Sequence, residues 1–207
     1  MLKSIIHGSK LPSQENTTPS SEKKELRTRL LVKRMHFSRT PQRTWADIEL
    51  AARLANILWW YSPCCVGLFW PVFAEFDVRA VVSRWLRGNA TRRAALPVIV
   101  AQHAPMVYHA WTPSSPMKEG RHQIPVPAHE DSIVPDLLMV PCIGYDVSRY
   151  RLGYGGGYFD RTLAAWPNYA GSPVTVGIAY ECLRISSLPH QAHDLPLDII
   201  ATDSICY

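Results

Sequence analysis

The chain has 207 residues, of which 47% are hydrophobic, so it holds enough apolar side chains for the core of one α/β-sized domain. A composition this apolar excludes a chain that is disordered throughout. The five cysteines are odd in number and show no C-x-x-C spacing, which excludes a disulfide framework and a cysteine metal site. We therefore expect free thiols and a cytoplasmic protein.

The formal net charge of +5 is concentrated near the N-terminus. Residues 1–44 carry ten Lys and Arg against three Asp and Glu, whereas residues 45–207 carry twelve against fourteen. A basic arm of this kind favours nucleic acid, but a basic helix lying over a small anionic ligand such as a nucleotide has the same composition. A solvated basic face is the third interpretation, and charge alone does not choose among the three.

Residues 1–20 are polar and lack apolar periodicity, which predicts a disordered leader without the apolar core of a signal peptide. We expect residues 21–207 to form a single domain. Its first helix is predicted to begin at Ser21, with Ser20 or Ser21 as N-cap. The apolar stripe predicted for this helix consists of Leu26, Leu30, Leu31 and Met35.

Residues 47–60 are expected to form a second amphipathic helix. Its predicted buried face consists of Ile48, Ala51, Ala52, Ala55, Leu58 and Trp59. The segment 54–74 is uncharged and long enough for a membrane span, but Pro63 and Pro71 interrupt it. We therefore predict a helix followed by a buried strand instead.

Apolar runs predict strands at residues 65–70, 94–101, 106–108, 137–141, 174–179 and 197–202, and a third helix at 77–87. Strands that alternate with helices indicate a three-layer α/β/α sandwich around a mainly parallel sheet, a Rossmann-like arrangement. Ligands gather beyond the carboxyl ends of such strands. The loops after Trp70, Pro141, Ala179 and Leu195 should therefore share one rim of the sheet.

The most informative stretch is R-L-G-Y-G-G-G-Y-F-D at residues 151–160, which follows a predicted strand and opens a helical segment. Its glycines are Gly153, Gly155, Gly156 and Gly157. Glycines let successive backbone N–H groups converge on phosphate oxygens, and a helix start adds partial positive charge. Arg151 and Arg161 bracket the loop, and Asp160 lies where a carboxylate could hold Mg²⁺ carried by phosphates. A tight structural turn is the alternative, but the setting favours a phosphate site.

These residues resemble the signature of the 5-formyltetrahydrofolate cyclo-ligase family, also called 5,10-methenyltetrahydrofolate synthetases. The match comprises P-D-L-L-M-V-P at residues 135–141, G-Y-D at 144–146 and the glycine stretch through Arg161. Weaker matches are K-K-E-L-R at residues 23–27, Glu75, and H-D-L-P-L-D at residues 193–198. The resemblance implies a three-layer α/β fold and an ATP- and Mg²⁺-dependent ring closure. The reaction converts 5-formyltetrahydrofolate to 5,10-methenyltetrahydrofolate and releases ADP and phosphate.

The resemblance also implies roles for individual residues. The implied ATP-binding residues are Lys23, Lys24, Arg27, Arg151, Gly153, Gly155, Gly156, Gly157 and Tyr158. Those implied in catalysis are Arg151, Tyr154, Gly155 and Gly156. The implied folate-binding residues are Trp70, Glu75, Tyr154 and Tyr158, with Glu75 accepting hydrogen bonds from the amino and ring N–H groups of the pterin. Asp160 and Asp194 would hold Mg²⁺, with Asp198 as an alternative ligand. Ordinary helix-surface, turn and core roles are the alternatives for these side chains.

The chain departs from the family pattern at residues 121–127, where His122 replaces an aromatic residue and Val126 a glutamate. These differences fall on the folate side of the site and leave open a paralogue that acts on another pterin. Two further alternatives are a non-catalytic paralogue that binds nucleotide or RNA through the basic N-terminal segment, and another ATP-dependent ligase or kinase. We expect ATP and 5-formyltetrahydrofolate, with or without a polyglutamate tail, as partners. We expect neither membrane nor nucleic acid, and a monomer or dimer.

Overall fold

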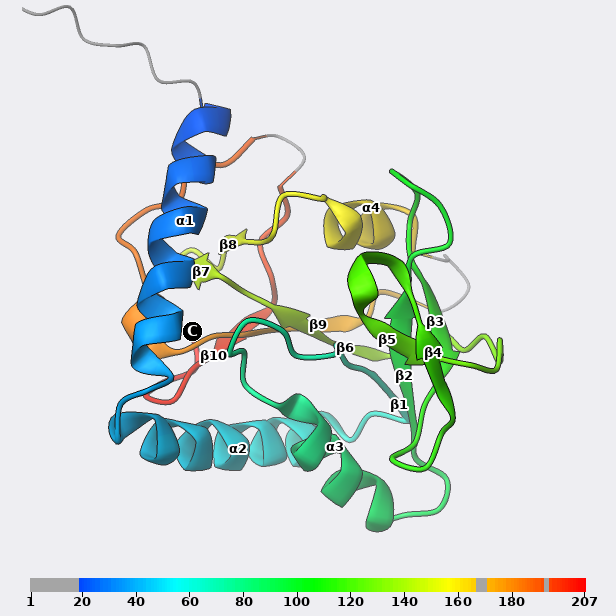
Figure 1. Ribbon diagram of the computed structural model, residues 1–207. Coiled ribbons are helices and arrows are strands. Elements are labelled where there is room, and N and C mark those ends of the chain that lie inside the picture. Colours follow the sequence, from blue (N-terminus) through cyan, green and yellow to red (C-terminus); the bar gives the residue numbers. More distant parts are fainter. Residues whose placement is uncertain (1–18, 167–170, 192–193) are drawn as a thin grey trace, which may run out of the picture.

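The computed structural model describes residues 19–166, 171–191 and 194–207 (Figure 1). A six-stranded sheet in the order β10-β9-β6-β1-β2-β3 forms its centre. All neighbouring pairs are parallel except β2 and β3, which are antiparallel. The strands are β1 Cys65–Gly67, β2 Arg93–Val98, β3 Val107–Ala110, β6 Leu137–Pro141, β9 Val174–Ile178 and β10 Ile199–Ala201.

Two small hairpins stand beside this sheet. The first pairs β4 (Met117–Glu119) with β5 (Pro125–Pro127), and the second pairs β7 (Gly144–Tyr145) with β8 (Arg151–Leu152). The helices are α1 Pro19–Phe37, α2 Gln42–Tyr61, α3 Val78–Arg87 and α4 Tyr158–Ala164, with short 3₁₀ turns η1 Arg121–Gln123 and η3 Glu181–Leu183.

The central strand β6 shows why the fold has three layers. Its side chains alternate between the two faces of the sheet, as the period of two in a strand requires. Leu137 and Met139 join the core cluster that contains buried residues of α2 and α3, whereas Leu138 and Val140 join the cluster packed against α4. Figure 1 shows α2 and α3 on one side of the sheet and α4 on the other. The predicted mainly parallel α/β sandwich is therefore confirmed.

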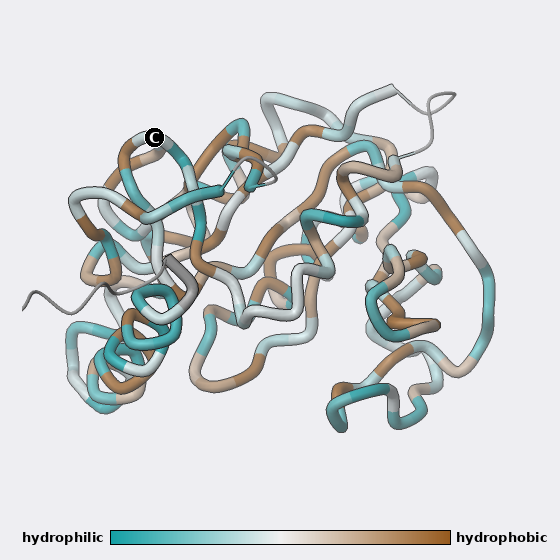
Figure 2. Tube along the Cα trace, turned by 90° about the horizontal axis from the view of Figure 1, so that it is seen from above, coloured by the Kyte–Doolittle hydropathy of each residue, from teal (hydrophilic) through white to brown (hydrophobic). Residues whose placement is uncertain are grey.

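Hydrophobic residues concentrate along the central strands, while the helices alternate between hydrophobic and hydrophilic residues (Figure 2). Helix α1 packs through Leu30 onto Gly144 of β7, where an added Cβ would stand 2.5 Å from the leucine Cδ1. This close approach fixes α1 against the hairpin that leads into the glycine stretch. The N-terminal helix is thereby placed beside the candidate site.

The predicted buried face of the second helix is confirmed at Leu58 but is wrong for most of its other members. In α2 the buried residues are Ala46, Leu50, Leu54, Ile57 and Leu58, whereas Ile48 and Trp59 are 53% and 76% exposed. The helix carries two apolar stripes, and only the tertiary contacts decide which of them faces the sheet. Met35 of α1 is likewise 39% exposed, and Arg34 takes the buried position beside it.

Other expectations differ from the structure at the ends of elements. Strand β1 ends at Gly67 rather than residue 70, although Phe69 is still buried, and α2 begins at Gln42 rather than 47. Leu195 precedes β10 instead of following a strand. The predicted leader lies outside the described residues apart from the start of α1 at residue 19, and His193 also lies outside them.

The structure also bears on two expectations drawn from the composition, which concern a membrane span and the cysteines. Among the described helices, none is both long enough and apolar enough to cross a membrane. All five cysteines are free thiols in the structure. Burial raises the pKa of Cys65 and Cys142 to about 12, so these two thiols are held in their protonated form.

Candidate active site

The hairpin β7–β8 directs the chain into the glycine stretch. Between its strands, the buried carboxylate of Asp146 accepts hydrogen bonds from the backbone N–H groups of Ser148 at 3.0 Å and Tyr150 at 3.2 Å. Its second oxygen accepts from the N–H of Leu188 at 2.9 Å. The aspartate of the G-Y-D motif therefore shapes the turn that returns the chain to Arg151.

The loop at residues 153–157, which we call the glycine loop, needs glycine at particular positions. Gly155 and Gly157 have φ angles of +92° and +64°, which side chains rarely adopt. A Cβ on Gly155 would also approach the Cζ atom of Arg27 to 3.3 Å. Gly153, in contrast, has no atom within 4 Å of where its Cβ would stand. The backbone thus lies directly against a cationic side chain of α1.

One cationic side chain of α1 reaches the glycine loop, and a second pairs with a carboxylate near it. The Arg27 Nε donates a 2.7 Å hydrogen bond to the carbonyl oxygen of Gly153. Lys23 lies one helical turn earlier and pairs with Asp194. Burial lowers the pKa of Arg27 from its ordinary value, and the negative charge of Asp194 partly offsets this change. Lys24 is exposed, about a quarter turn around the helix from Lys23.

Two more arginines flank the glycine loop from its own ends. Arg151 is nearly buried, with 6% of its side chain exposed, and its Nη2 donates to Asp160 at 2.7 Å. Arg161 donates to the carbonyl oxygen of Gly156, and its Cζ stands 5.1 Å from the centre of the Tyr158 ring. Three arginines therefore lie at the loop, and Lys23 pairs with Asp194 nearby; each is bonded to a carbonyl or carboxylate oxygen that a phosphate oxygen could replace.

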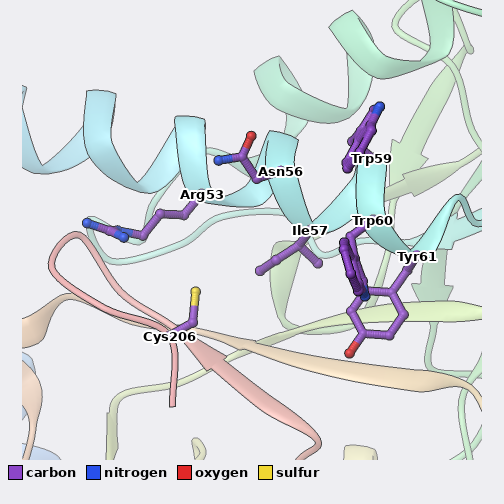
Figure 3. Close-up of a pocket in the computed structure, with 7 residues that line it drawn as sticks. All are labelled: Arg53, Asn56, Ile57, Trp59, Trp60, Tyr61 and Cys206. Atoms are coloured by element: carbon purple, nitrogen blue, oxygen red, sulfur yellow. The ribbon is translucent and has the colours of Figure 1, made fainter.

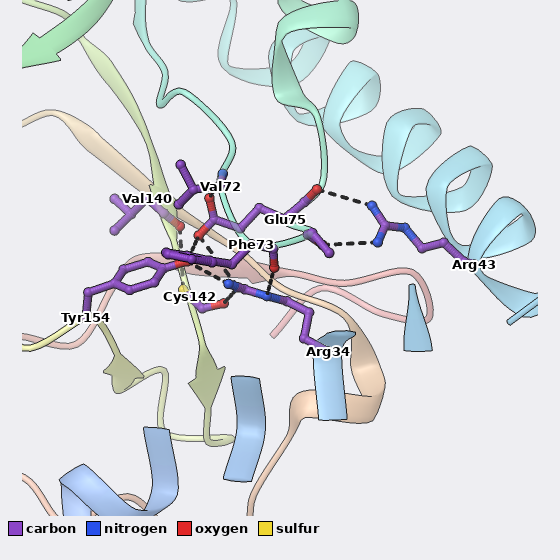
Figure 4. A network of polar contacts seen from close by, with 9 residues as sticks. Arg34, Arg43, Val72, Phe73, Glu75, Val140, Cys142 and Tyr154 are labelled. Atoms are coloured by element: carbon purple, nitrogen blue, oxygen red, sulfur yellow. Dashed lines mark hydrogen bonds and ion pairs between the residues drawn. The ribbon is translucent and has the colours of Figure 1, made fainter. Parts of the chain in front are cut away.

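A polar network that is buried at Arg34 and Glu75 joins the glycine loop to the loop that follows β1 (Figure 4). The Tyr154 hydroxyl donates a 2.6 Å hydrogen bond to Glu75 and lies 2.6 Å from the Arg34 Nη2. The Nη1 of Arg34 is 3.6 Å from the Glu75 carboxylate. Arg34 and Glu75 are 1% and 8% exposed, so this ion pair is withdrawn from water. Burial raises the pKa of Glu75, while Arg34 and Tyr154 act to lower it.

The loop at residues 72–75 is held in shape by arginines from two helices. Phe73 and Ala74 have φ angles of +47° and +61°, a left-handed conformation that is costly for non-glycine residues. Arg34 donates to the carbonyl oxygen of Phe73 at 3.0 Å, and Arg43 of α2 donates to that of Ala74 at 3.0 Å. Arg34 also reaches the carbonyl oxygen of Cys142 at 3.4 Å, so the loops after β1 and β6 share one rim, as predicted.

Aromatic side chains stand beside the carboxylate of Glu75. Phe73 is 63% exposed, and its ring centre lies 6.0 Å from that of Tyr154, which is 41% exposed. Trp70 is half-buried against the core, with the Arg79 Cζ 4.0 Å from its ring centre. In the divergent segment, His122 is exposed and Val126 is buried. A flat polar molecule that reached Glu75 would meet the rings of Phe73 and Tyr154.

Sequence reasoning missed three residues of this site: Arg34, Arg43 and Phe73. A signal was available for Arg34, because it lies on the same helical face as Lys23, Arg27 and the buried Leu30. No comparable sequence pattern indicates Phe73, since its role depends on the left-handed backbone of the loop.

The candidate metal ligands are engaged with cations in this structure. Asp160 pairs with Arg151, and Asp194 pairs with Lys23. The alternative ligand Asp198 accepts hydrogen bonds from the backbone N–H and hydroxyl of Thr175, at 2.8 and 2.7 Å. Within the described ranges, no group of three or more His, Cys, Asp or Glu residues is arranged to hold a metal ion. The donor set fits a metal that brings its own phosphate ligands, because Mg²⁺ commonly binds through one or two carboxylates together with substrate phosphates.

Comparison with known proteins extends the similarity beyond these motifs. The profile of the 5-formyltetrahydrofolate cyclo-ligase family matches residues 19–203. The chain is 30% identical over 166 residues to the 5-formyltetrahydrofolate cyclo-ligase of Escherichia coli K12, covering 75% of this chain and 89% of the relative. It is 26% identical over 186 residues to the corresponding protein of Haemophilus influenzae, covering 86% and 96%.

Solved structures show the same fold. The NMR structure of 5,10-methenyltetrahydrofolate synthetase from Aquifex aeolicus superposes with a TM-score of 0.72 at 24% identity, covering 89% of this chain and 91% of the other. The synthetase from Mycoplasma pneumoniae superposes with a TM-score of 0.70 at 23% identity, covering 88% and 99%. The resemblance carried by the glycine stretch is therefore confirmed.

Proposed function

Because the chain belongs to the 5-formyltetrahydrofolate cyclo-ligase family, we propose that it closes the ring of 5-formyltetrahydrofolate to give 5,10-methenyltetrahydrofolate, using ATP. The observation that carries this proposal is the hydrogen bond between Tyr154 and Glu75. It connects a loop suited to phosphate with a carboxylate and aromatic rings suited to a pterin. The two substrates would then meet where the two loops touch.

The phosphate half of the site consists of the glycine loop and the cations around it. Arg27, Arg151 and Lys23 would exchange their present oxygen partners for phosphate oxygens of ATP, with little movement of their backbones. Gly155, Gly156 and Gly157 would present backbone N–H groups without side chains in the way, and Tyr158 would line the edge. Lys24 would contribute through its charge alone.

The pterin half consists of Glu75, Phe73, Tyr154 and Trp70. As a carboxylate, Glu75 would accept hydrogen bonds from an amino group and an adjacent ring N–H, a pairing that fixes the orientation of the ring. The rings of Phe73 and Tyr154 would cover its flat faces. Arg34 would keep Glu75 ionised and in place, since without this cation a buried carboxylate tends to take up a proton.

The chemistry asks the protein mainly for positioning and charge neutralisation. The formyl oxygen attacks the γ-phosphorus of ATP, the bond to ADP breaks, and electron density from N5 gives a phosphorylated iminium. N10 then attacks the activated carbon and loses its proton, and phosphate departs with the former formyl oxygen. Arg151 and the glycine-loop backbone would stabilise the charge that builds on the transferred phosphoryl group, and Tyr154 would hold the formyl-bearing ring beside it.

We propose that Asp160 and Asp194 hold the Mg²⁺ that accompanies ATP. When bound, this ion neutralises phosphate charge and orients the γ-phosphoryl group. Lys23 and Arg151 would turn to the phosphates as ATP arrives, which would release both carboxylates from their present ion pairs. Arrival of the nucleotide and exposure of the metal ligands would thus be one event.

Three of the six Lys and Arg side chains of α1 make contacts within the molecule. Arg27 bonds to the glycine loop, Lys23 pairs with Asp194 and Arg34 is buried, which supports a nucleotide ligand over RNA for this helix. Its remaining exposed charges would favour the acidic tail of a polyglutamylated folate. We place the protein in the cytoplasm, in keeping with its free thiols.

The test is the appearance of methenyltetrahydrofolate absorbance in the near ultraviolet from 5-formyltetrahydrofolate, ATP and Mg²⁺. We expect product from the wild type and a raised KM for ATP in Lys23→Ala. The matched control is Lys33→Ala, which removes an exposed lysine of the same helix and should keep the wild-type KM. A folded, ATP-binding wild-type protein that forms no product would reject the proposal.

A further inference from the structure

Arg43 lies in the first turn of α2 and uses all three nitrogen atoms of its guanidinium group. Its Nε donates to the two carboxylate oxygens of Asp47 at 2.8 and 2.9 Å. Its Nη1 donates to the carbonyl oxygen of Ala74 at 3.0 Å, and its Nη2 donates to that of Glu75 at 3.2 Å (Figure 4). Because the guanidinium is planar and its donors have fixed directions, these bonds set the turn at residues 72–75, which we call the Glu75 turn, at one angle to α2.

The guanidinium of Arg43 is itself held from behind. Asp47 also accepts a hydrogen bond from the hydroxyl of Tyr180. The ring of Tyr180 lies against the guanidinium, with the Arg43 Cζ 4.6 Å from the ring centre. Tyr180 is 1% exposed and packs against Phe37 of α1, with ring centres 5.1 Å apart. Arg43 is therefore confined by a carboxylate and a buried ring, which keep it at the Glu75 turn.

The Glu75 turn decides where the carboxylate of Glu75 points. Ala74 has a left-handed backbone with φ of +61°, which a non-glycine residue adopts only when its surroundings hold it there. In this turn the N–H of Glu75 donates to the carbonyl oxygen of Val72 at 3.0 Å, and Oε2 of Glu75 accepts from the N–H of Val72 at 2.9 Å. The other oxygen, Oε1, accepts from Tyr154. The direction of the carboxylate thus depends on a backbone that Arg43 holds.

Arg34 and Arg43 hold this turn in different ways. Arg34 touches both halves of the proposed site, because it bonds to Tyr154 of the glycine loop as well as to the Glu75 turn. Among the described residues, the polar partners of Arg43 are Asp47 and the Glu75 turn, and its ring partner is Tyr180. A change at Arg43 therefore reaches the pterin half and leaves the contacts of the glycine loop in place.

We propose that Arg43 is a positioning residue for the folate, which sets the orientation of Glu75 by holding the backbone of the Glu75 turn. Asp47 and Tyr180 are its support. This inference rests on the proposed function, because it takes Glu75 to be the carboxylate that meets the pterin. It adds that the setting of this carboxylate comes from α2 and from the loop after β9, through groups that do not touch either substrate.

The kinetic consequence is one-sided. Without Arg43, the Glu75 turn can relax from its left-handed conformation, and the carboxylate leaves the direction that suits the pterin. Folate binding should then weaken, whereas ATP binding should not, because Arg27 and Arg151 keep their contacts at the glycine loop. A residue that only stabilised the fold would behave differently. Its loss would lower the active fraction of the protein, and with it kcat, and would leave both KM values as they are.

The experiment compares Arg43→Met with Arg53→Met in the full chain. Arg53 is a matched control, because it lies on the same helix and pairs with Glu49 at 3.7 Å, one helical turn away. It lines a pocket of about 400 Å³ to which neither the Glu75 turn nor the glycine loop contributes a residue (Figure 3). Steady-state kinetics give the KM for 5-formyltetrahydrofolate at saturating ATP and the KM for ATP at saturating folate. Isothermal titration calorimetry gives the Kd of the folate.

In Arg43→Met we expect the KM and the Kd for the folate to rise by roughly 10- to 100-fold, as loss of a charge-assisted hydrogen bond produces, with the KM for ATP near that of the wild type. Arg53→Met should keep the wild-type value of all three constants. Tyr180→Phe keeps the ring and removes the hydroxyl that holds Asp47, so it should raise both folate constants by a smaller factor. This milder variant decides the result if Arg43→Met does not fold.

Unchanged folate constants in a folded Arg43→Met overturn the inference, as do unchanged constants in Tyr180→Phe where Arg43→Met is unfolded. An equal rise in the KM for folate and the KM for ATP also overturns it. A wild type that binds the folate without forming product rejects the proposed function alone, and the Kd values of the variants then decide the inference. A wild type that does not bind the folate overturns both.

Discussion

The hydroxyl of Tyr154 donates a 2.6 Å hydrogen bond to the carboxylate of Glu75 and stands at the same distance from the guanidinium of Arg34. Tyr154 belongs to the glycine loop, Glu75 to the loop after β1, and Arg34 to α1. Three segments distant in the sequence are thus fixed to one another by one phenol. The position of the proposed pterin ligand depends on the conformation of the proposed phosphate loop.

Tyr154→Phe tests this coupling. The change keeps the aromatic ring and removes the hydroxyl that holds Glu75. Since a hydrogen bond to a charged group contributes about 1.5–3 kcal/mol, kcat/KM for the folate should fall by roughly 10- to 100-fold. Steady-state kinetics with saturating ATP measures this effect.

Tyr150→Phe is the control for that substitution. Tyr150 lies shortly before the glycine loop and stacks on His190 with ring centres 4.1 Å apart, a contact that phenylalanine preserves. It should keep a kcat/KM near that of the wild type. Equal losses in the two variants would show that Glu75 does not depend on the Tyr154 hydroxyl.

Arg34→Met removes the cation from a buried carboxylate. Leaving one partner of a buried ion pair uncompensated costs about 3–5 kcal/mol, so the free energy of unfolding near neutral pH should drop by that order. Arg34→Met with Glu75→Gln removes both charges and should recover most of the loss. Urea denaturation of the three proteins measures the difference.

The contribution of Glu75 to the free energy of unfolding changes with pH in a definite direction. Burial raises the pKa of Glu75 above its ordinary value, so the native state holds this proton more tightly than the unfolded chain does. Stability from this group therefore falls as pH rises from the ordinary glutamate pKa through the raised native pKa. Arg34 opposes the rise, so in Arg34→Met the fall should be larger and extend to higher pH. A pH profile parallel to that of the wild type would mean that Arg34 does not set the charge of Glu75.

The contrast between the two stripes of α2 shows what sequence could and could not predict. The α/β class and the family resemblance follow from local patterns, and the structure and the comparisons bear them out. The phosphate-binding role of the glycine loop stays a prediction. The choice between the stripe of Leu50 and that of Ile48 is not local, because both repeat at helical spacing. The prediction from periodicity placed Ile48 and Trp59 on the buried face, and both lie outside the core.

Arg34 illustrates a second limit. Arginine is almost never fully buried unless it is paired, so an arginine within a helix is ordinarily assigned to the surface. Its burial here depends on Glu75, Phe73 and Cys142, which reach it from two other loops. The backbone of Phe73 shows the same dependence, since its carbonyl oxygen accepts a hydrogen bond from Arg34 of α1.

Gly155→Ala and Gly153→Ala test the conformation of the glycine loop. At Gly155 an alanine would have to adopt φ near +92° and would press on the guanidinium of Arg27 at 3.3 Å. The backbone term alone costs about 1–2 kcal/mol, so the loop should shift and the KM for ATP should rise by roughly 5- to 30-fold. At Gly153 the added methyl meets open space and should have the smaller effect. A larger effect at Gly153 would show that the loop binds ATP in a different conformation.

Asp160→Asn tests the proposed metal ligand, and Asp198→Asn provides its matched control. Asparagine at 160 keeps the shape of the side chain and loses the charge, which should raise the Mg²⁺ concentration for half-maximal activity at fixed ATP. Asp198 holds Thr175 at the start of β9, so Asp198→Asn should lower the melting temperature and keep the wild-type Mg²⁺ requirement.

A raised Mg²⁺ requirement in Asp198→Asn with an unchanged one in Asp160→Asn would move the metal from α4 to the segment before β10. Thermal shifts with ATP alone separate the two effects, because losing a metal ligand should weaken the response to Mg-ATP far more than the response to ATP.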